Sequence, residues 1–484
     1  MDFSALEERV IVEVNLKEEE YEDYVEFVEK VVIPSFRKFV EFKQRTLYND
    51  KPALYFRLRD SSSLLEALIV AGRNPYYRII GFGKVRENLI SSLASSIEGA
   101  TALYYETKGM GTVYFALVKG MKVTPPKYER GLRRALSKLF MGNMVFVFAI
   151  SILFFVGLYF IFKEWTPLAI VLSQIPLLLI SPKIIAFAMG DWKLSSENRF
   201  LYLAGIRIPL DFYDQVLKDF FYPKRFEFKR ELYERTLGSG REVTVEDVEE
   251  LLAKYGFPSV PYEITIKKVD VYSLVKKVFS EYGLPVPEIV LSNVPIANAA
   301  ASGPDPRFSS IMITTGLLAK LEEGEIEAVI GHEASHIKRR DPLLLYGLSS
   351  AEYLSRVAVV LSLYGFFLNY PLLELIYIWF SITMLFIAAK IIEARADLEA
   401  ALRTGKPREL ASALRKIGLL RLLKEKTPNS RLASWISFLD PHPPLSYRVE
   451  TLSKLDPSGV KGVWREAVKR CFKDLLNSLK ESLS

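Results

Sequence analysis

Hydrophobic and polar positions divide this chain of 484 residues into segments of very different character. Residues 143–162 form an uncharged run of twenty positions, and residues 166–182 form a second run that ends at Lys183. Twenty helical residues span about 30 Å, which matches the hydrocarbon core of a bilayer. A hairpin buried in a soluble core is the alternative, but runs of this length favour the membrane. We therefore expect a transmembrane hairpin over residues 143–190.

A third apolar zone lies between Leu343 and Ala389 and contains only three charged side chains. The Asn-Tyr-Pro sequence at residues 369–371 interrupts it near the middle, as expected for a turn between two helices. The pattern predicts two further spans, about 343–368 and 371–390, so a second hairpin covers residues 343–390. The chain would thus be a multi-domain membrane protein with four transmembrane helices.

The sequence before the first hairpin alternates apolar and polar positions in several short stretches, which is typical of half-buried strands. Two intervening stretches, Glu18–Val32 and Val85–Ile97, have helical spacing. We therefore expect an N-terminal soluble α+β domain over residues 1–140, in the approximate order βαββαββ. Its expected strand-like runs are Arg9–Leu16, Ala53–Arg59, Tyr76–Gly83 and Ala102–Lys119.

Charge indicates the orientation and the partners. The 64 basic and 57 acidic residues give a net charge of +7, which is small for this length, so we expect no nucleic-acid partner. A single cysteine excludes an intramolecular disulfide and suits a reducing compartment. The acidic N-terminus does not resemble a signal peptide. Basic residues cluster before the first and third spans and after the fourth, so the positive-inside rule places both termini and residues 183–342 in the cytoplasm.

The chain has three histidines, and two of them lie in the sequence His332-Glu-Ala-Ser-His336. The surrounding residues 324–340 have helical periodicity, and residues four apart on a helix lie on one face. Two imidazoles in that position can bind one Zn²⁺ ion, and Glu333 can take a proton from the water that the metal activates. Two hydrogen-bonded core histidines are the alternative, but this motif rarely arises by chance in a chain with so few histidines.

A catalytic zinc ion needs a third protein ligand, and no histidine follows nearby. Glu393 is the best candidate, with Glu399 as the alternate. The interval of 57 residues from His336 to Glu393 suits two membrane crossings and a turn, which would return the third ligand to the zinc helix. Asp397 lies one helical turn beyond Glu393 and can accept a hydrogen bond from a ligand histidine, fixing its tautomer.

The third histidine, His442, lies among prolines in a segment that ends at Arg448. An ordinary loop is one interpretation. Because the chain has so few histidines, we favour a functional place, in which His442 and Arg448 stabilise the oxyanion of a tetrahedral intermediate. Glu352 and Arg356 are one turn apart in the third span and form either a structural pair or part of a path to the substrate.

These motifs together resemble the HtpX-like membrane zinc metalloproteases, which are relatives of the type 1 CaaX prenyl proteases. The resemblance covers roughly residues 265–455, including Asn298–Gly303, the zinc motif, Glu393–Asp397 and His442–Arg448. It implies a mainly helical, gluzincin-type zincin domain with a small edge sheet, built from residues 191–342 and 391–484. It also implies that Asn298 and Ala299 begin an edge strand that pairs with the substrate backbone.

We therefore expect a multi-pass cell-membrane zinc metalloendopeptidase with one Zn²⁺ ion and with its active site at the cytoplasmic face. Its partners would be the lipid bilayer and polypeptide substrates, which we expect to be membrane or misfolded proteins removed in protein quality control. Processing of CaaX-type prenylated proteins is an alternative, although four spans would enclose less space than a prenyl protease does. A non-catalytic membrane scaffold is the other alternative, and Glu333 argues against it because metal binding alone does not require a general base.

Overall fold

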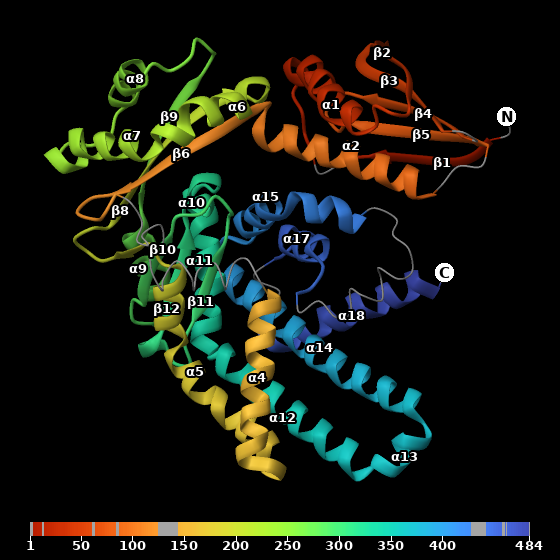
Figure 1. Cartoon of the computed structure of the whole chain (residues 1–484), viewed down its shortest axis with the longest axis vertical. Helices are drawn as coiled ribbons and strands as arrows, with labels where there is room; N and C mark the ends of the chain where they lie inside the picture. The colour runs from red at the N-terminus through yellow and green to blue at the C-terminus, as the bar shows by residue number, and fades with distance from the viewer. Residues whose placement is uncertain are drawn as a thin grey trace.

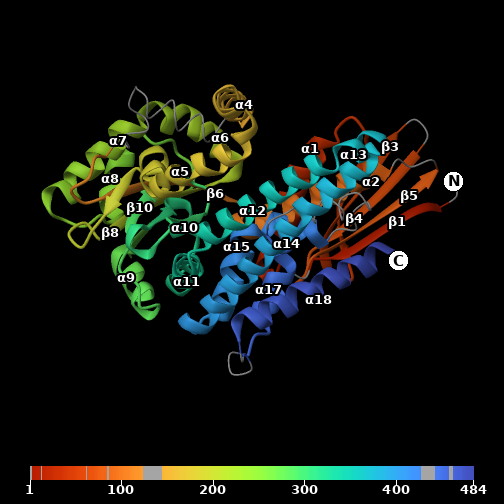
Figure 2. The same cartoon turned by 90° about the horizontal axis from the view of Figure 1, so that it is seen from below.

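The computed structural model describes residues 3–11, 14–60, 63–83, 87–123, 144–426, 442–456, 460 and 462–483. Over these residues the chain is mostly helical, with a sheet-rich N-terminal region and two further small sheets. Figures 1 and 2 place the N-terminal sheet at one end of the body and helices α7 (Tyr222–Arg235) and α8 (Val245–Lys254) at the other. Most of the basic residues that precede the first expected span lie outside the described residues.

The N-terminal region is a five-stranded antiparallel sheet with two helices on one face. The strands lie in the order β1-β5-β4-β3-β2. Alternate side chains of the central strands are buried against the helices, which is why the sequence alternates. The elements are β1 (Phe3–Val10), α1 (Tyr21–Ser35), β2 (Val40–Tyr48), β3 (Lys51–Asp60), β4 (Ser63–Val70), β5 (Tyr76–Gly83) and α2 (Glu87–Thr107).

The observed order differs from the expected one at three places. Strand β1 ends at Val10, whereas Ile11, Val14 and Leu16 are buried without strand pairing as the chain crosses to α1. Helix α2 continues to Thr107, so only the second half of the expected run 102–119 is a strand. Strands β2 and β4 were not predicted, and β2 is exposed along almost its whole length, so it carries no alternating pattern.

The strand that follows α2 belongs to a second sheet. Strand β6 (Met110–Val118) pairs with β8 (Phe200–Pro209), which pairs in turn with β9 (Glu263–Asp270). The expected N-terminal domain of residues 1–140 thus includes a strand that is shared with the 191–342 region. The sequence gives no local sign of this, because the partner strand lies about ninety residues further along the chain.

A third sheet positions the site and has the order β11-β12-β10-β7. Strands β10 and β12 are parallel, the other pairs are antiparallel, and β11 lies at the edge. The strands are β7 (Trp192–Leu194), β10 (Glu288–Ser292), β11 (Ala299–Ser302) and β12 (Ser310–Thr314). The helices that pack near them are α9 (Val271–Glu281), α10 (Thr315–Lys320), α11 (Glu323–Arg339) and α15 (Pro407–Lys426).

The apolar helices extend from one side of the body (Figure 1). They are α4 (Met144–Phe162), α5 (Thr166–Met189), α12 (Asp341–Ser362), α13 (Tyr364–Asn369) and α14 (Pro371–Thr404). Three helical stretches, 152–189, 341–362 and 371–404, are long and apolar enough to cross a membrane by length and composition. Outward-facing side chains such as Phe160, which is 76% exposed, are typical of a lipid-facing surface. The count of four spans stays a prediction.

Candidate metal centre

Helix α11 carries the two histidines of the His-Glu-x-x-His motif and is fixed at both ends. A capping box of Glu322 and Glu325 begins the helix. Arg340, with a φ of 55°, ends it and separates it from α12, which begins at Asp341. Gly331, directly before the motif, lets α14 approach closely, because a Cβ there would lie 2.7 Å from the Thr404 Cγ2 atom. This close packing brings the far end of α14 beside the histidines.

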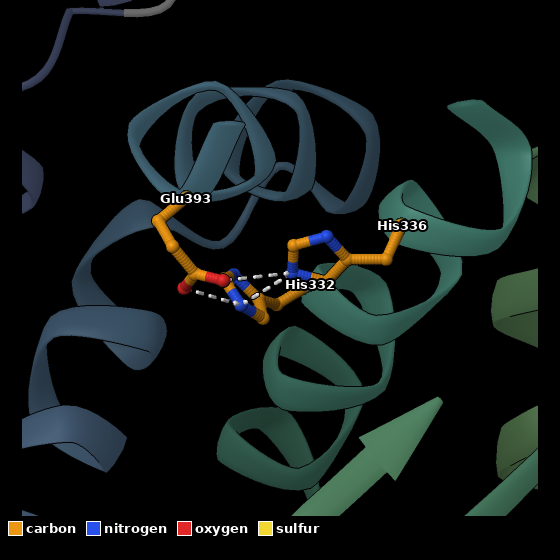
Figure 3. A group of neighbouring side chains, drawn as sticks. All are labelled: His332, His336 and Glu393. Carbon is orange, nitrogen blue, oxygen red and sulfur yellow. Dashed lines mark hydrogen bonds and ion pairs between the residues drawn. The ribbon is translucent and has the colours of Figure 1, made fainter. Parts of the chain in front are cut away.

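His332, His336 and Glu393 converge on one point between α11 and α14 (Figure 3). The Nε2 atoms of the two imidazoles are 3.1 Å apart. The Glu393 carboxylate oxygens lie 3.6 Å from Nε2 of His332 and 3.5 Å from Nε2 of His336. Helix α14 continues beyond the expected end of the fourth span to Thr404, so Glu393 lies on the same helix that forms the second hairpin.

This donor set fits a zinc ion. Ligands bound at about 2.0–2.1 Å in a tetrahedral arrangement are separated by about 3.3–3.4 Å, which is close to the separations of 3.1, 3.5 and 3.6 Å found here. The outer nitrogens of both rings face carboxylates, so the inner Nε2 atoms are left as lone-pair donors. Two imidazole nitrogens and a carboxylate that face one another form a site for a cation.

Each ligand histidine is backed by a buried aspartate. Nδ1 of His332 lies 2.9 Å from the Asp397 carboxylate. Asp397 in turn accepts two hydrogen bonds of 2.7 Å from the Arg448 guanidinium. Such partners fix the orientation and tautomer of a metal-binding imidazole. The expected position of Asp397 behind a ligand histidine therefore has a geometric basis in the structure.

The partner of the second histidine was not predicted. Nδ1 of His336 lies 2.7 Å from the carboxylate of Asp341, which is 1% exposed. In the sequence, the Asp-Pro pair at 341–342 indicates the end of one helix and the start of the next, with Asp341 as its cap, and gives no sign of a contact with His336. Asp341 also accepts a hydrogen bond from Arg395, whose side chain is fully buried in the middle of the Glu393–Asp397 motif. The sequence shows only an acidic residue directly after the zinc helix, and its contact with His336 depends on the turn at Arg340.

Glu399, the alternate ligand, lies away from this point. Its carboxylate accepts hydrogen bonds from Ser335, Arg339, Arg395 and Arg403. It therefore neutralises arginines beneath the zinc helix, on the side of α14 that does not face the imidazoles. The geometry favours Glu393 over Glu399, as expected from their angular separation on the helix.

The charges around His332 shift the pKa of its imidazole. Burial lowers the pKa of His332, but Asp397 and Glu393 outweigh burial and raise the pKa to about 10. Burial likewise opposes the charge of Arg448, and Asp397 outweighs it and raises the pKa of the guanidinium. Asp397 and Glu393 therefore favour positive charge at His332, which suits a divalent cation.

Glu333 and strand β11 face each other across the site. The backbone N–H of Ala301 donates a hydrogen bond of 2.7 Å to the Glu333 carboxylate. Thr314 on β12 donates its backbone N–H to the carbonyl of Asn298. Peptide groups alternate in direction along a strand, so those of Ala299 and Ala301 point away from β12, toward the zinc helix. The general-base candidate is thus in contact with the open edge of the sheet.

Eight of the nine site residues expected from sequence line one cavity of about 560 Å³. They are Asn298, Ala299, His332, Glu333, His336, Glu393, His442 and Arg448. The ninth, Asp397, lies behind His332. His442 is half-exposed, and its Nδ1 atom lies 3.1 Å from the Glu393 carboxylate. The residues directly before His442, from 427 to 441, lie outside the described part of the chain.

Comparisons with known proteins match the part of the chain that forms this site. The model of peptidase family M48 matches residues 265–456. A protease HtpX homolog of Thermococcus kodakarensis is 31% identical over 215 residues, covering 38% of this chain and 73% of the relative. A protease HtpX homolog of Pyrococcus furiosus is 29% identical and covers the same shares. The crystal structure of S. mikatae Ste24p aligns over 75% of this chain and 74% of its own, with 14% identity and a TM-score of 0.37.

The apolar helices and the matched site define the class of this protein as a membrane metallopeptidase. The likeness to the HtpX homologs covers more than two thirds of those relatives, and it confirms the resemblance seen in the sequence. The chain belongs to peptidase family M48 and, within it, to the HtpX-like proteases. Members of this family are zinc-dependent metalloproteases, and the relatives are membrane proteins.

Proposed function

We propose that this chain is a membrane-embedded zinc metalloendopeptidase that hydrolyses peptide bonds of membrane or misfolded proteins at the cytoplasmic face. One observation carries the proposal: three lone-pair donors, His332, His336 and Glu393, converge beside Glu333 and an open strand edge. A scaffold that only binds metal needs the three ligands, but it needs neither the Glu333 carboxylate nor the open edge of β11. One Zn²⁺ ion is assigned to the three ligands.

Bound zinc would lower the pKa of a water molecule to about 7 and polarise the carbonyl to be attacked. Glu333 would take the proton of that water and later deliver it to the leaving nitrogen of the cleaved peptide bond. Its contact with the Ala301 N–H holds the carboxylate in place in the substrate-free state. Glu333 would therefore carry out both proton transfers, from the water and to the leaving nitrogen.

Substrate would bind as an added strand along β11. The peptide groups of Ala299 face away from β12, and the carbonyl of Asn298 is already used within the sheet. An extended chain can therefore hydrogen-bond to Ala299 and to the carbonyl of Ala301, with its next peptide group beside Glu333. Backbone pairing of this kind tolerates many side chains, which suits the clearance of misfolded proteins.

The remaining residues would orient the ligands and stabilise charge. Asp397 would hold the ring of His332, and Arg448 would hold Asp397 through two of its nitrogens while it lines the cavity. Two nitrogens of the Arg448 guanidinium therefore serve to hold Asp397 in position. His442, half-exposed beside Glu393, is the donor better placed to stabilise the developing oxyanion.

The decisive test uses purified protein, an unfolded soluble protein and a membrane protein reconstituted with the enzyme. We expect cleavage of both, loss of cleavage on removing zinc with a chelator, and recovery on adding zinc back. Glu333→Gln, loaded with zinc, is the control for a contaminating protease. Failure of the folded, zinc-loaded protein to cleave either substrate would contradict the proposal.

The proposed orientation is tested by labelling. Cysteines placed at Lys163 and Asn369 in a Cys471→Ser background should react with an impermeant reagent only from the side opposite to one placed at Arg241. The proposed cytoplasmic active site requires Arg241 to be labelled from the cytoplasm. Labelling of all three positions from one side would exclude the four-span arrangement.

A further inference from the structure

A second cavity of about 410 Å³ lies between α5 and α12, within the apolar helices. Polar side chains line much of it, which is unusual for a surface among membrane helices. They are Gln174 on α5 and Ser349, Ser350, Glu352 and Arg356 on α12. Neither Gln174 nor Ser350 has a hydrogen-bond partner among the residues that the structure describes, so both retain their full capacity to bind a polar ligand.

The charged residues of this cavity neutralise each other. Nε of Arg356 donates a hydrogen bond of 2.7 Å to Glu352, and the Ser381 hydroxyl of α14 donates another of 2.7 Å to the same carboxylate. The expected pairing of Glu352 and Arg356 is therefore present. A neutral set of donors and acceptors is a poor site for a phosphate or a metal cation. It suits a ligand that has both N–H and C=O groups.

The second cavity follows the metal-site cavity along one face of α12. Pro342 and Leu345 line the metal-site cavity, and Ser349, Glu352 and Arg356 line the second. Successive positions in this series are three or four apart and share a helix face. Leu345 and Arg356 are about 16 Å apart along the helix. Helix α5, the other wall, also contacts β11 and β12, so both walls lead to the substrate edge.

One hydrogen bond joins α12 to α5 at a level between the two cavities. The Tyr346 hydroxyl donates to the backbone carbonyl of Val171 at 2.8 Å and joins α12 to α5 in the turn between them. A chain that passes from one cavity to the other must displace this contact. A single hydrogen bond contributes about 0.5–1.5 kcal/mol, so it can open readily.

A membrane-spanning substrate must lose helical hydrogen bonds before it can pair with β11. Each unpaired peptide group in lipid costs several kcal/mol, so the unwound part needs donors and acceptors at membrane depth. We propose that the cavity between α5 and α12 binds the backbone amide groups of an unwound membrane-spanning segment and leads it to the edge strand. This inference rests on the proposed function and adds the route by which a membrane substrate reaches the site.

The first test compares two substrates with variants that make the cavity apolar. Gln174→Leu and Ser350→Leu should reduce kcat/KM for a single-span protein, reconstituted with the enzyme in phosphatidylcholine vesicles, by roughly 10- to 100-fold, because several buried peptide groups lose partners. Cleavage of an unfolded soluble protein should stay within about twofold, because it does not cross the membrane helices. Ser355→Leu is the matched control, since Ser355 lies on the same helix, is exposed, and hydrogen-bonds only to its own helix at Ala351.

The outcomes separate this inference from the proposed function. If the unmodified enzyme cleaves neither substrate, the proposed function fails. If it cleaves both and the cavity variants affect both equally or neither, the route is wrong. If Ser355→Leu also reduced cleavage of the membrane substrate, the proposed route would be wrong, because the effect would not be specific to the cavity.

The second test is direct and does not depend on activity. A cysteine at Ser350, in the inactive Glu333→Gln protein with Cys471→Ser, should form a disulfide with a cysteine in the membrane span of the substrate. A cysteine at Ser355 should not. Equal cross-linking at both positions, or none at Ser350, would overturn the proposal.

Discussion

The molecule buries two clusters of charged side chains, one in the N-terminal sheet and one at the metal centre. In the N-terminal region, Arg9 and the Tyr77 hydroxyl both donate to the carboxylate of Glu98, which lies on α2. At the metal centre, Arg448 and Arg395 donate to Asp397 and Asp341, and these carboxylates face the outer nitrogens of the ligand histidines. Both clusters are deeply buried and connect elements that are far apart in the sequence.

The clusters differ in what lies at their centres. In the N-terminal cluster donors meet an acceptor, because Arg9 and the Tyr77 hydroxyl both point at the Glu98 carboxylate. At the metal centre the inner nitrogens of His332 and His336 face each other at 3.1 Å, with Glu393 beside them. Acceptors that face each other are unfavourable unless a proton or a metal cation joins them. Convergence of acceptors, rather than burial of charge, therefore distinguishes the functional cluster from the structural one.

The largest expected effect comes from removing a group at that point of convergence. Glu393→Ala should abolish zinc retention and turnover, because two imidazoles alone leave two coordination positions open. Glu399→Gln is the matched control: it should lower stability, because three arginines lose their carboxylate, yet retain zinc. Elemental analysis of the purified proteins measures both. Full zinc and full turnover in Glu393→Ala would exclude this residue as the third ligand.

The next effect separates chemistry from metal binding. Glu333→Gln should keep zinc and fold, because the amide oxygen can still accept the hydrogen bond from Ala301. Turnover should fall by about 10²- to 10⁴-fold, since an amide cannot take the proton of water. Zinc content and cleavage should be measured on the same preparation. A zinc-loaded variant with normal turnover would remove Glu333 from the mechanism.

The sequence predicted the centre of the site better than its surroundings. The spacing of His332 and His336 reflects helix geometry, and the interval to Glu393 reflects the length of a membrane hairpin, so both are visible in sequence. The contact of Asp341 with His336 depends on the turn at Arg340, where the chain adopts a positive φ. That turn cannot be predicted from an Asp-Pro pair, which equally signals a helix start. The pairing of β6 with β8 also leaves no local signal in the sequence, because the two strands are far apart along the chain.

A smaller effect is expected from the carboxylates that orient the histidines. Asp397→Asn keeps the shape of the side chain but weakens its hold on His332 and its pairing with Arg448. Zinc affinity or turnover should fall by roughly 10- to 100-fold, as is usual for partners of metal ligands. Competition with a chelator of known affinity measures the first, and turnover at saturating zinc measures the second. Unchanged values for both would show that the Arg448–Asp397 pair is structural, like the N-terminal cluster.

The smallest effect on function is expected from the N-terminal cluster itself. Tyr77→Phe keeps the buried ring but removes the hydroxyl that donates at 2.9 Å to Glu98. Burial and the neighbouring carboxylates of Glu98 and Glu7 raise the pKa of Tyr77, so the hydroxyl stays protonated and remains a donor over the physiological range. A lost hydrogen bond to a buried carboxylate should lower the local free energy of opening by about 1.5–3 kcal/mol, measured by hydrogen exchange in the N-terminal sheet. Zinc content and turnover per folded molecule should be unchanged, because the cluster contains no converging acceptors. A fall in turnover of the folded, zinc-loaded variant would contradict the distinction between the two clusters and would indicate that the N-terminal sheet acts on the metal centre.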